Sequence, residues 1–132
     1  MLNLEIITPE KKVLDETVDS VTIPTASGEV GILAKHAPLI SSLRPGILSY
    51  SKGGTTAKLV ISGGFVEVSA DRVSILSDIA EDLAAIDTET AKSEREAAEK
   101  IVSGYKGTEE DFEAELEKLE RANARLQLAS GK

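Results

Sequence analysis

The 132-residue chain lacks cysteine and tryptophan, and aromatic residues make up only 3% of it. The lack of cysteine excludes disulfides, thiolate nucleophiles and cysteine-ligated zinc, and it fits a reducing compartment. With two Phe and two Tyr, the chain has little material for base-stacking platforms. Its core therefore has to be built from Val, Ile, Leu and Ala.

Long apolar runs and a basic N-terminal start are also absent. No stretch approaches the ~20 apolar residues that cross a bilayer. The segment from Met1 to Thr8 alternates polar and apolar residues and carries Glu5, unlike a signal peptide. A net charge of -8 repels phosphate backbones and anionic lipid. We therefore expect no nucleic-acid binding and no direct membrane insertion, and any membrane association has to come through another protein.

Period-two alternation dominates the first 76 residues. With 41% hydrophobic and 29% charged residues, the composition is typical of a globular chain with one core and at most a small appendage. Short strands at intervals of roughly ten residues are typical of a sandwich or barrel. The positions expected to face the core are Leu2, Leu4, Ile6, Val21, Ile23, Leu59, Ile61, Val66, Val68, Val73 and Ile75. The expected turns lie at Asp15-Glu16, Ser27-Gly28, Pro45-Gly46, Gly53-Gly54 and Asp71-Arg72.

The pattern changes after Ser77. Residues Asp78–Ala85 are a polar, alanine-containing bridge without alternation, and helical spacing follows them. We therefore divide the chain into an all-β domain, residues 1–85, and a helical segment, residues 86–132.

Two helices joined by a short link are expected in the helical segment. Asp87 can cap the first and Thr108 the second through a side-chain oxygen. The apolar stripe of the first helix consists of Ala91, Ala98, Ile101 and Val102, and the seam of the second of Phe112, Leu116, Leu119, Asn123 and Leu126. The link Ser103–Gly107 favours an antiparallel hairpin. Because this hairpin has few large apolar side chains, it has to pack on the β domain or on another chain, so we expect two docking states.

No arrangement of catalytic residues stands out in the sequence. The only histidine, His36, has no second histidine, cysteine or carboxylate pattern beside it, so it either stabilises a loop or contacts a partner. No serine stands in a G-x-S-x-G turn, and a small β-fold hydrolase would have to use His36. The pairs Gly53-Gly54 and Gly63-Gly64 lack the phosphate-loop context and are better explained as hairpin turns or a strand bend.

The charged residues of the second helix allow two interpretations each. The acidic cluster at residues 109–117 suits the N-terminal end of the helix dipole, or it offers a surface to a basic partner. Arg121 and Arg125 stabilise the C-terminal end of the helix, or they pair with an acidic partner or a bound phosphate.

Several segments taken together resemble the epsilon subunit of F-type ATP synthases, over essentially the whole chain. They are Ile7-Thr8-Pro9, Ser27–Leu33 with His36-Ala37-Pro38-Leu39, Ser62-Gly63-Gly64-Phe65, Val73–Leu76, Ile86-Asp87 and Arg121–Leu126. The resemblance implies a flattened ten-stranded β-sandwich followed by an antiparallel two-helix hairpin, in a non-catalytic subunit of a rotor.

The resemblance also implies partners. The sandwich would be held by the gamma subunit and rest on the c-ring, with Glu29 and His36 as candidate ring contacts. The hairpin would either lie beside the sandwich or extend along gamma into the catalytic alpha and beta subunits and restrain ATP hydrolysis. Arg121 and Arg125 would then face acidic segments of that catalytic head. The implied location is the cytoplasmic face of a bacterial plasma membrane, reached through the complex, with a plastid thylakoid as the alternative.

Some bacterial members of the family bind ATP in the folded hairpin, through an Ile-Asp-x-x-Arg-Ala motif and arginines on both helices. The residues here that could form such a site are Ile86, Asp87, Ala91, Arg95, Arg121 and Arg125. Thr90 stands where the motif has its arginine, and Glu89 lies beside it. Losing a cationic phosphate donor weakens nucleotide binding. We therefore expect weak or no ATP binding, no other cofactor and no metal, and an ATP-sensing switch is the alternative function.

Overall fold

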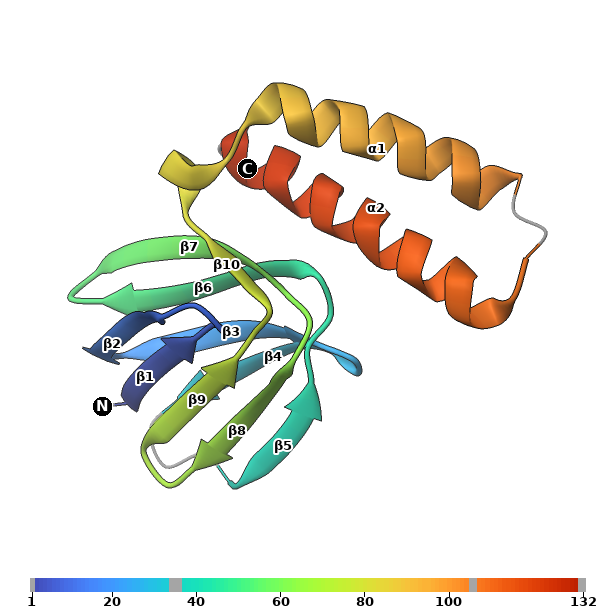
Figure 1. The fold of residues 1–132 in the computed structure, drawn as a ribbon. Helices are drawn as coiled ribbons and strands as arrows, with labels where there is room; N and C mark the ends of the chain where they lie inside the picture. Colours follow the sequence, from blue (N-terminus) through green and yellow to red (C-terminus); the bar gives the residue numbers. More distant parts are fainter. Residues whose placement is uncertain (1, 34–36, 105–106, 131–132) are drawn as a thin grey trace.

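The computed structural model describes residues 2–33, 37–104 and 107–130. Within them, ten strands form two five-stranded sheets, and two antiparallel helices follow. Figure 1 shows the helical hairpin on the side of the sandwich where strands β6 and β7 lie. This confirms the predicted all-β sandwich with a C-terminal two-helix hairpin.

The two sheets are called sheet A and sheet B below. Sheet A has the order β2-β1-β9-β8-β5 and consists of β1 (Leu2–Ile7), β2 (Lys12–Val18), β5 (Leu39–Ser42), β8 (Phe65–Ser69) and β9 (Arg72–Leu76). Sheet B has the order β10-β7-β6-β3-β4 and consists of β3 (Ser20–Thr25), β4 (Gly28–Leu33), β6 (Gly46–Lys52), β7 (Thr55–Ser62) and β10 (Ile79–Glu81). Paired strands run antiparallel, except for β1 and β9, which run parallel.

The core lies between the two sheets. All of the inward-facing positions expected from the alternation are buried, which confirms that prediction. They are joined by Val18, Ile32, Leu43 and Leu48. Because successive side chains of a strand point to opposite faces, each sheet also has an outer face that points away from this core. Residues of the core do not cover these outer faces.

Two glycine pairs make different connections. Gly53 and Gly54, with φ of 58° and 81°, close the tight β6–β7 hairpin, as predicted. Gly63 and Gly64 form a bend that carries the chain from β7 in sheet B to β8 in sheet A. A Cβ atom on Gly64 would lie 1.8 Å from the carbonyl oxygen of Leu76, so this bend requires glycine.

The turn predicted at Asp15-Glu16 is wrong. Both residues lie inside β2, and the β1–β2 turn is formed by residues 8–11, where the Thr8 N–H donates to the Lys11 carbonyl over 2.9 Å. Strand β2 is an edge strand, which carries charged side chains readily. The Asp15 carboxylate pairs with Lys12 at 3.4 Å, so its polarity reflects an ion pair on the strand and not a turn.

The bridge without alternation at Asp78–Ala85 has regular structure. It contains β10 and a short 3-10 helix, η1 (Leu83–Ala85). With only three residues, β10 is too short to show a recognisable alternation. It pairs with β7 through Ile79 opposite Ser62 and Glu81 opposite Val60, so the last strand of the sandwich lies within the expected linker.

The helices are α1 (Thr88–Ser103) and α2 (Glu109–Ala129). Both predicted caps are confirmed: the Asp87 carboxylate accepts the Thr90 N–H, and the Thr108 hydroxyl accepts the Asp111 N–H, each over 3.2 Å. In the described part of the chain, neither helix is long and apolar enough to cross a membrane.

The stripe predicted on α1 is only partly right. Ala91 and Ala98 are buried and Val102 is half-buried, but Ile101 is exposed. Ile101 lies in the last turn of α1, at the end of the hairpin that projects away from the sandwich in Figure 1.

Candidate functional site

Helix α2 covers the outer face of sheet B over strands β6 and β7. Val60 points outward, because its neighbours Leu59 and Ile61 point into the core, yet Val60 is 0% exposed. It packs in a separate apolar cluster with Ala124 and Leu128 of α2, and Ile47 and Ile86 are packed against that cluster. Strand β7 is therefore buried on both faces at this point, and the hairpin is supported by the sandwich of its own chain.

The seam predicted on α2 differs from the stripe that is buried. Asn123 is exposed, and Phe112, Leu116, Leu119 and Leu126 are only half-buried. The buried residues of α2 are instead Ala122, Ala124 and Leu128. The reason is that α2 has two neighbours, α1 and sheet B, so its apolar surface is divided between two stripes. Small alanines allow the close approach that larger side chains would prevent.

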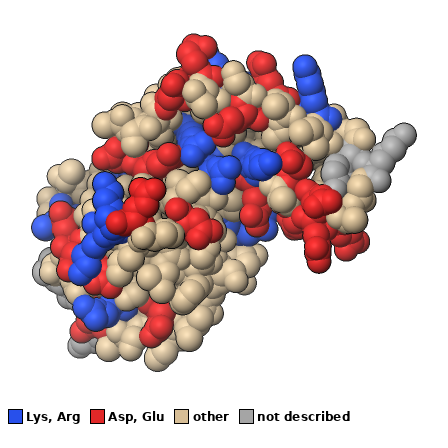
Figure 2. Space-filling view, in the orientation of Figure 1, with Lys and Arg blue, Asp and Glu red and all other residues tan. Residues whose placement is uncertain are grey.

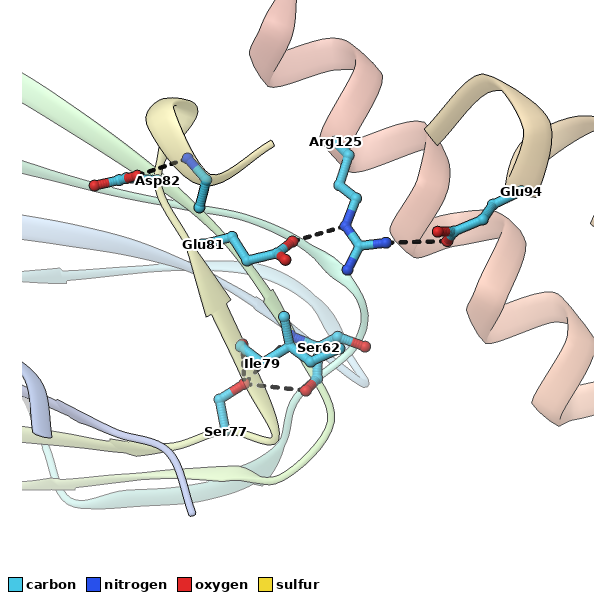
Figure 3. A network of polar contacts seen from close by, with 8 residues as sticks. Ser62, Ser77, Ile79, Glu81, Asp82, Glu94 and Arg125 are labelled. Atoms are coloured by element: carbon cyan, nitrogen blue, oxygen red, sulfur yellow. Dashed lines mark hydrogen bonds and ion pairs between the residues drawn. The ribbon is translucent and has the colours of Figure 1, made fainter. Parts of the chain in front are cut away.

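Arg125 joins the three elements that meet here. Figure 3 shows its guanidinium between Glu81 of β10 and Glu94 of α1. Its Nε lies 2.7 Å from Glu81 Oε1, and its Nη1 lies 3.0 Å from Glu94 Oε2. The Arg125 side chain is largely buried, so these charge-assisted bonds are shielded from water. We call Arg125, Glu81 and Glu94 the Arg125 clamp.

The β10 end of the clamp is held by a buried serine. The Ser77 hydroxyl lies 3.0 Å from the Ser62 carbonyl oxygen and 2.7 Å from that of Ile79, and it accepts the Ser62 N–H over 3.2 Å. These bonds, visible in Figure 3, tie the start of β10 to the end of β7. Glu81 is thereby presented to the hairpin from a fixed backbone.

A second set of ion pairs lies further along α2. Arg44, between β5 and β6, forms a hydrogen bond with Glu120, and its Nη1 is 3.8 Å from a carboxylate oxygen of both Glu113 and Glu117. The hydrogen bond to Glu120 is the main reason that the pKa of Arg44 is raised. Part of the acidic cluster that was expected to be solvated or to await a basic partner therefore faces an arginine of the same chain.

A small cavity brings together four of the six candidate nucleotide-site residues. It has a volume of about 160 Å³, and its lining includes Ile86, Asp87, Ala91 and Arg125. Three carboxylates also line it, those of Glu81, Asp87 and Glu94, while Arg125 is its one cationic residue. The Thr90 N–H holds the pKa of Asp87 below its usual range, which keeps that carboxylate charged.

The other two candidate residues, Arg95 and Arg121, do not line this cavity. Arg95 lines a neighbouring hollow of about 460 Å³ between the helices, with Lys92 and Gln127. The Nε atoms of Arg95 and Arg121 are buried without a hydrogen-bond partner among the described residues. Figure 2 shows basic side chains gathered near the middle of this face, with acidic side chains around them.

Of the candidate ring contacts, Glu29 is exposed on β4, an edge strand of sheet B. His36 lies outside the described residues. The structure therefore gives Glu29 an accessible position.

The outer face of sheet A carries apolar side chains that nothing in the described chain covers. Ile40 of β5 is 72% exposed, Phe65 of β8 is 43% exposed and Leu76 of β9 is 39% exposed. Phe65 and Leu76 are direct cross-strand partners, and Ile7 pairs with Leu76 on the other side. Ile40 lies one strand further, beside Glu67. This apolar row is called the open face of sheet A.

Sequence reasoning missed Arg44, Glu81, Glu94 and Val60. Their partners lie far away in the chain: Arg44 and Glu120 are 76 residues apart, and Arg125 and Glu81 are 44 apart. No local spacing rule connects such residues. One clue was present, because Leu59, Val60 and Ile61 form an unbroken apolar run, which is typical of a strand that is covered on both faces.

Comparison with known proteins gives a consistent set of relatives. Residues 1–83 match the family described as "ATP synthase, Delta/Epsilon chain, beta-sandwich domain". The ATP synthase epsilon chain of Herpetosiphon aurantiacus is 45% identical over 97% of this chain and 93% of that protein. The ATP synthase epsilon chain of Halalkalibacterium halodurans is 41% identical over 97% of this chain and 96% of that protein.

Solved structures with the same fold were also found. A chain in the Euglena gracilis mitochondrial ATP synthase, in a structure of OSCP, F1 and the c-ring, has a TM-score of 0.81 and 31% identity, over 98% of this chain and 81% of that one. A chain in the central stalk and c-ring structure of the Tetrahymena thermophila mitochondrial ATP synthase shares the fold, with a TM-score of 0.70 and 17% identity over 97% and 96% of the two chains.

Replacing Leu128 with alanine should loosen the hairpin without unfolding the sandwich. The change leaves a cavity over Val60 and should lower the free energy of local opening of α2 by about 2 kcal/mol. Amide hydrogen exchange, followed separately in α2 and in the sandwich strands, measures it. Leu83→Ala is the matched control, because Leu83 is exposed. Equal protection of α2 in both variants would contradict this assignment.

Proposed function

The chain belongs to the family of ATP synthase epsilon chains, and from this premise we propose that it couples the catalytic head to the c-ring and restrains ATP hydrolysis through its hairpin. As an epsilon chain it is a non-catalytic subunit of the synthase. A chain of the same fold and 31% identity belongs to an assembly that contains F1 and the c-ring, which supports a place in the rotor.

One observation carries the proposal: the two outer faces of the sandwich differ. The β6–β7 part of the outer face of sheet B is covered by the chain's own hairpin, whereas the open face of sheet A exposes Ile40, Phe65 and Leu76. Exposed apolar side chains gathered on one face favour a protein contact. Covering the open face with the gamma subunit would hold the sandwich on the rotor and leave the hairpin free to leave sheet B.

The c-ring contact is proposed at the end of the sandwich that carries Glu29. This carboxylate is exposed on β4, where it can pair with polar loops of the ring. His36 is the second candidate for that contact. In this arrangement the chain is a peripheral protein on the cytoplasmic face of a bacterial plasma membrane, or on a plastid thylakoid, and reaches the membrane through the complex.

The proposed regulation needs a second position of the hairpin. In the docked position Arg125 is occupied by Glu81 and Glu94, so it can meet acidic segments of the alpha and beta subunits only after the clamp opens. Arg121 is the other proposed contact with the catalytic head. Because Arg125 would exchange the carboxylates of Glu81 and Glu94 for carboxylates of the head, the free-energy cost of moving this largely buried arginine stays small.

The alternative, a switch that closes over ATP, is not favoured by the docked hairpin. The cavity lined by Ile86, Asp87 and Ala91 has about 160 Å³, whereas ligand pockets usually have about 300 Å³ or more. Three carboxylates and one arginine leave it with a surplus of negative charge, which repels a triphosphate. From the size and charge of this cavity and from Thr90 in place of the motif's arginine, we propose weak or no nucleotide binding at Ile86, Asp87 and Ala91, and no other cofactor.

Introducing a carboxylate on the open face should weaken binding of gamma. Ile40→Glu and Phe65→Glu each place a charge in the proposed interface and should lower affinity at least about tenfold, the effect of losing an interface hot spot. Co-purification and titration with gamma measure it. Leu33→Glu is the control, since Leu33 is 66% exposed but lies on β4 of sheet B. If Leu33→Glu alone disrupted binding, the docking face would be the wrong one.

Removing the hairpin should release hydrolysis. A chain that ends at Ile86 keeps the open face, so it should still assemble with gamma, while ATP hydrolysis by the assembled head should rise about fivefold or more, the lower end of typical coupling between sites. Steady-state hydrolysis with the full and shortened chains measures it. Unchanged rates with full assembly would leave the hairpin without a regulatory role.

Calorimetry with ATP distinguishes a hairpin that restrains hydrolysis without binding ATP from a hairpin that closes over ATP. Wild-type chain should give no saturable heat at micromolar ATP, and Arg121→Ala and Arg125→Ala should not differ from it. Thr90→Arg combined with Glu94→Gln adds one cation and removes one anion at the cavity, so affinity should rise at least about tenfold. Micromolar binding by the wild type that is lost in Arg125→Ala would instead support the sensor.

A further inference from the structure

The stripe of α2 that faces sheet B changes character along the helix. Glu113, Glu117, Glu120, Ala124 and Leu128 follow one another at steps of four, three, four and four, so they share one face. The last two pack on Val60. The first three are the carboxylates that surround Arg44.

Full burial of α2 side chains is confined to the last part of the helix. The buried residues of α2 are Ala122, Ala124 and Leu128, and nothing from residue 109 to residue 121 is fully buried. Along that stretch, Arg44 of the sandwich forms ion pairs with Glu113, Glu117 and Glu120. Ion pairs therefore tie the first half of α2 to the sandwich, and Ala124 and Leu128 pack its last turns on Val60.

Arg44 is presented on a rigid support. Its backbone N–H donates to the Pro24 carbonyl over 3.1 Å, and the preceding Leu43 donates to the Gly64 carbonyl over 3.0 Å. Leu43 is buried in the core and bridges to Thr25. A side chain on a fixed backbone loses less freedom when it binds, so the guanidinium is already placed for its partners.

The three partners are not equivalent. The Arg44 and Glu120 side chains are half-buried and form a hydrogen bond, while Glu113 and Glu117 are more exposed and lie 3.8 Å from the guanidinium. Glu120 therefore supplies most of the attraction, since exposed pairs contribute little. If Arg44 were neutral, the three carboxylates would be left on one face without a cation, and repulsion would favour release of the helix.

We propose that Arg44 with Glu113, Glu117 and Glu120 is a latch that sets how much of the hairpin is docked on the sandwich. This Arg44 latch deepens the proposed function, because it names the contact whose opening precedes regulation. Being electrostatic, it opens as ionic strength rises, whereas the apolar contact of Leu128 does not. Release of α2 therefore begins in its first half and proceeds towards the Arg125 clamp.

The full chain, free of other subunits, allows a direct test. Because it has no cysteine, two cysteines introduced at exposed positions, Ser69 in sheet A and Ala114 in α2, take spin labels uniquely. Pulsed electron paramagnetic resonance then gives the ratio of docked to undocked hairpin. In the wild type this ratio should fall between about 0.1 M and about 1 M NaCl, as the Debye length shortens from about 10 to about 3 Å.

Arg44→Gln should lower the docked ratio at low salt about tenfold, the effect of losing one hydrogen bond to a charged group, and should remove most of its salt dependence. Glu120→Gln removes the other charged partner of the same hydrogen bond, so it should also lower the docked ratio. Arg72→Gln, the same change at an exposed residue of β9 in sheet A, should leave the ratio unchanged. Adding Glu120→Arg to Arg44→Glu should restore docking that Arg44→Glu alone destroys.

A wild-type ratio and salt response in both Arg44→Gln and Glu120→Gln would overturn the latch. Thermal unfolding of each variant shows whether the sandwich itself is intact. The test needs no partner subunit, so it is independent of the hydrolysis measurement. If docking depends on Arg44 but removal of the hairpin does not change ATP hydrolysis, the latch is supported and the proposed regulatory function is refuted.

Discussion

Val60 sits on the outside of a β-sandwich and is nevertheless fully buried, because α2 lies across it. The position of the hairpin relative to the sandwich depends on this contact. It supports a hairpin that has too few large apolar side chains to be stable alone. It also makes the two outer faces of the sandwich different, since only one can be occupied by the hairpin. The open face of sheet A is what remains for another subunit.

Charges surround this contact and make it reversible. Along α2 the Arg44 latch precedes the apolar cluster, and the Arg125 clamp lies within the same turns as that cluster, because Arg125 directly follows Ala124. Helix α2 is therefore held by polar contacts as well as by packing. Ion pairs near a surface contribute modestly and can be exchanged for other partners. Such a helix can be docked in one assembly state and released in another. Arg125 cannot pair with Glu81 and Glu94 and with the catalytic head at the same time. A contact of Arg125 with the head therefore requires the hairpin to leave the sandwich.

The sandwich and the helix caps could be predicted from local sequence, because their causes are local. Alternation reports which side chains of a strand face the core, and a cap needs only an oxygen three residues before an N–H. Asp87 and Thr108 were therefore identified correctly as caps. Strand β10 was missed because three residues are too few to alternate, and Asp15-Glu16 was mistaken for a turn because an edge strand carries charge.

The interface between hairpin and sandwich could not be predicted in the same way. Its members come from β5–β6, β7, β10 and both helices, and only the folded chain brings them together. The seam that was predicted on α2 followed its largest apolar residues, whereas the contact with sheet B uses Ala124, Leu128 and three glutamates. Of the candidate nucleotide-site residues, the fold brings Ile86, Asp87, Ala91 and Arg125 to one small cavity. The sequence did not reveal that Arg125 is already paired with Glu81 and Glu94.

The central claim is that the hairpin has two positions, docked on sheet B and released in the assembled synthase. Spin labels at positions 69 and 114 report both, in the free chain and in the complex with gamma and the catalytic head. We predict one distance in the free chain at low salt, and a second, longer distance in the complex when hydrolysis is restrained. The same single distance in both samples would contradict the account.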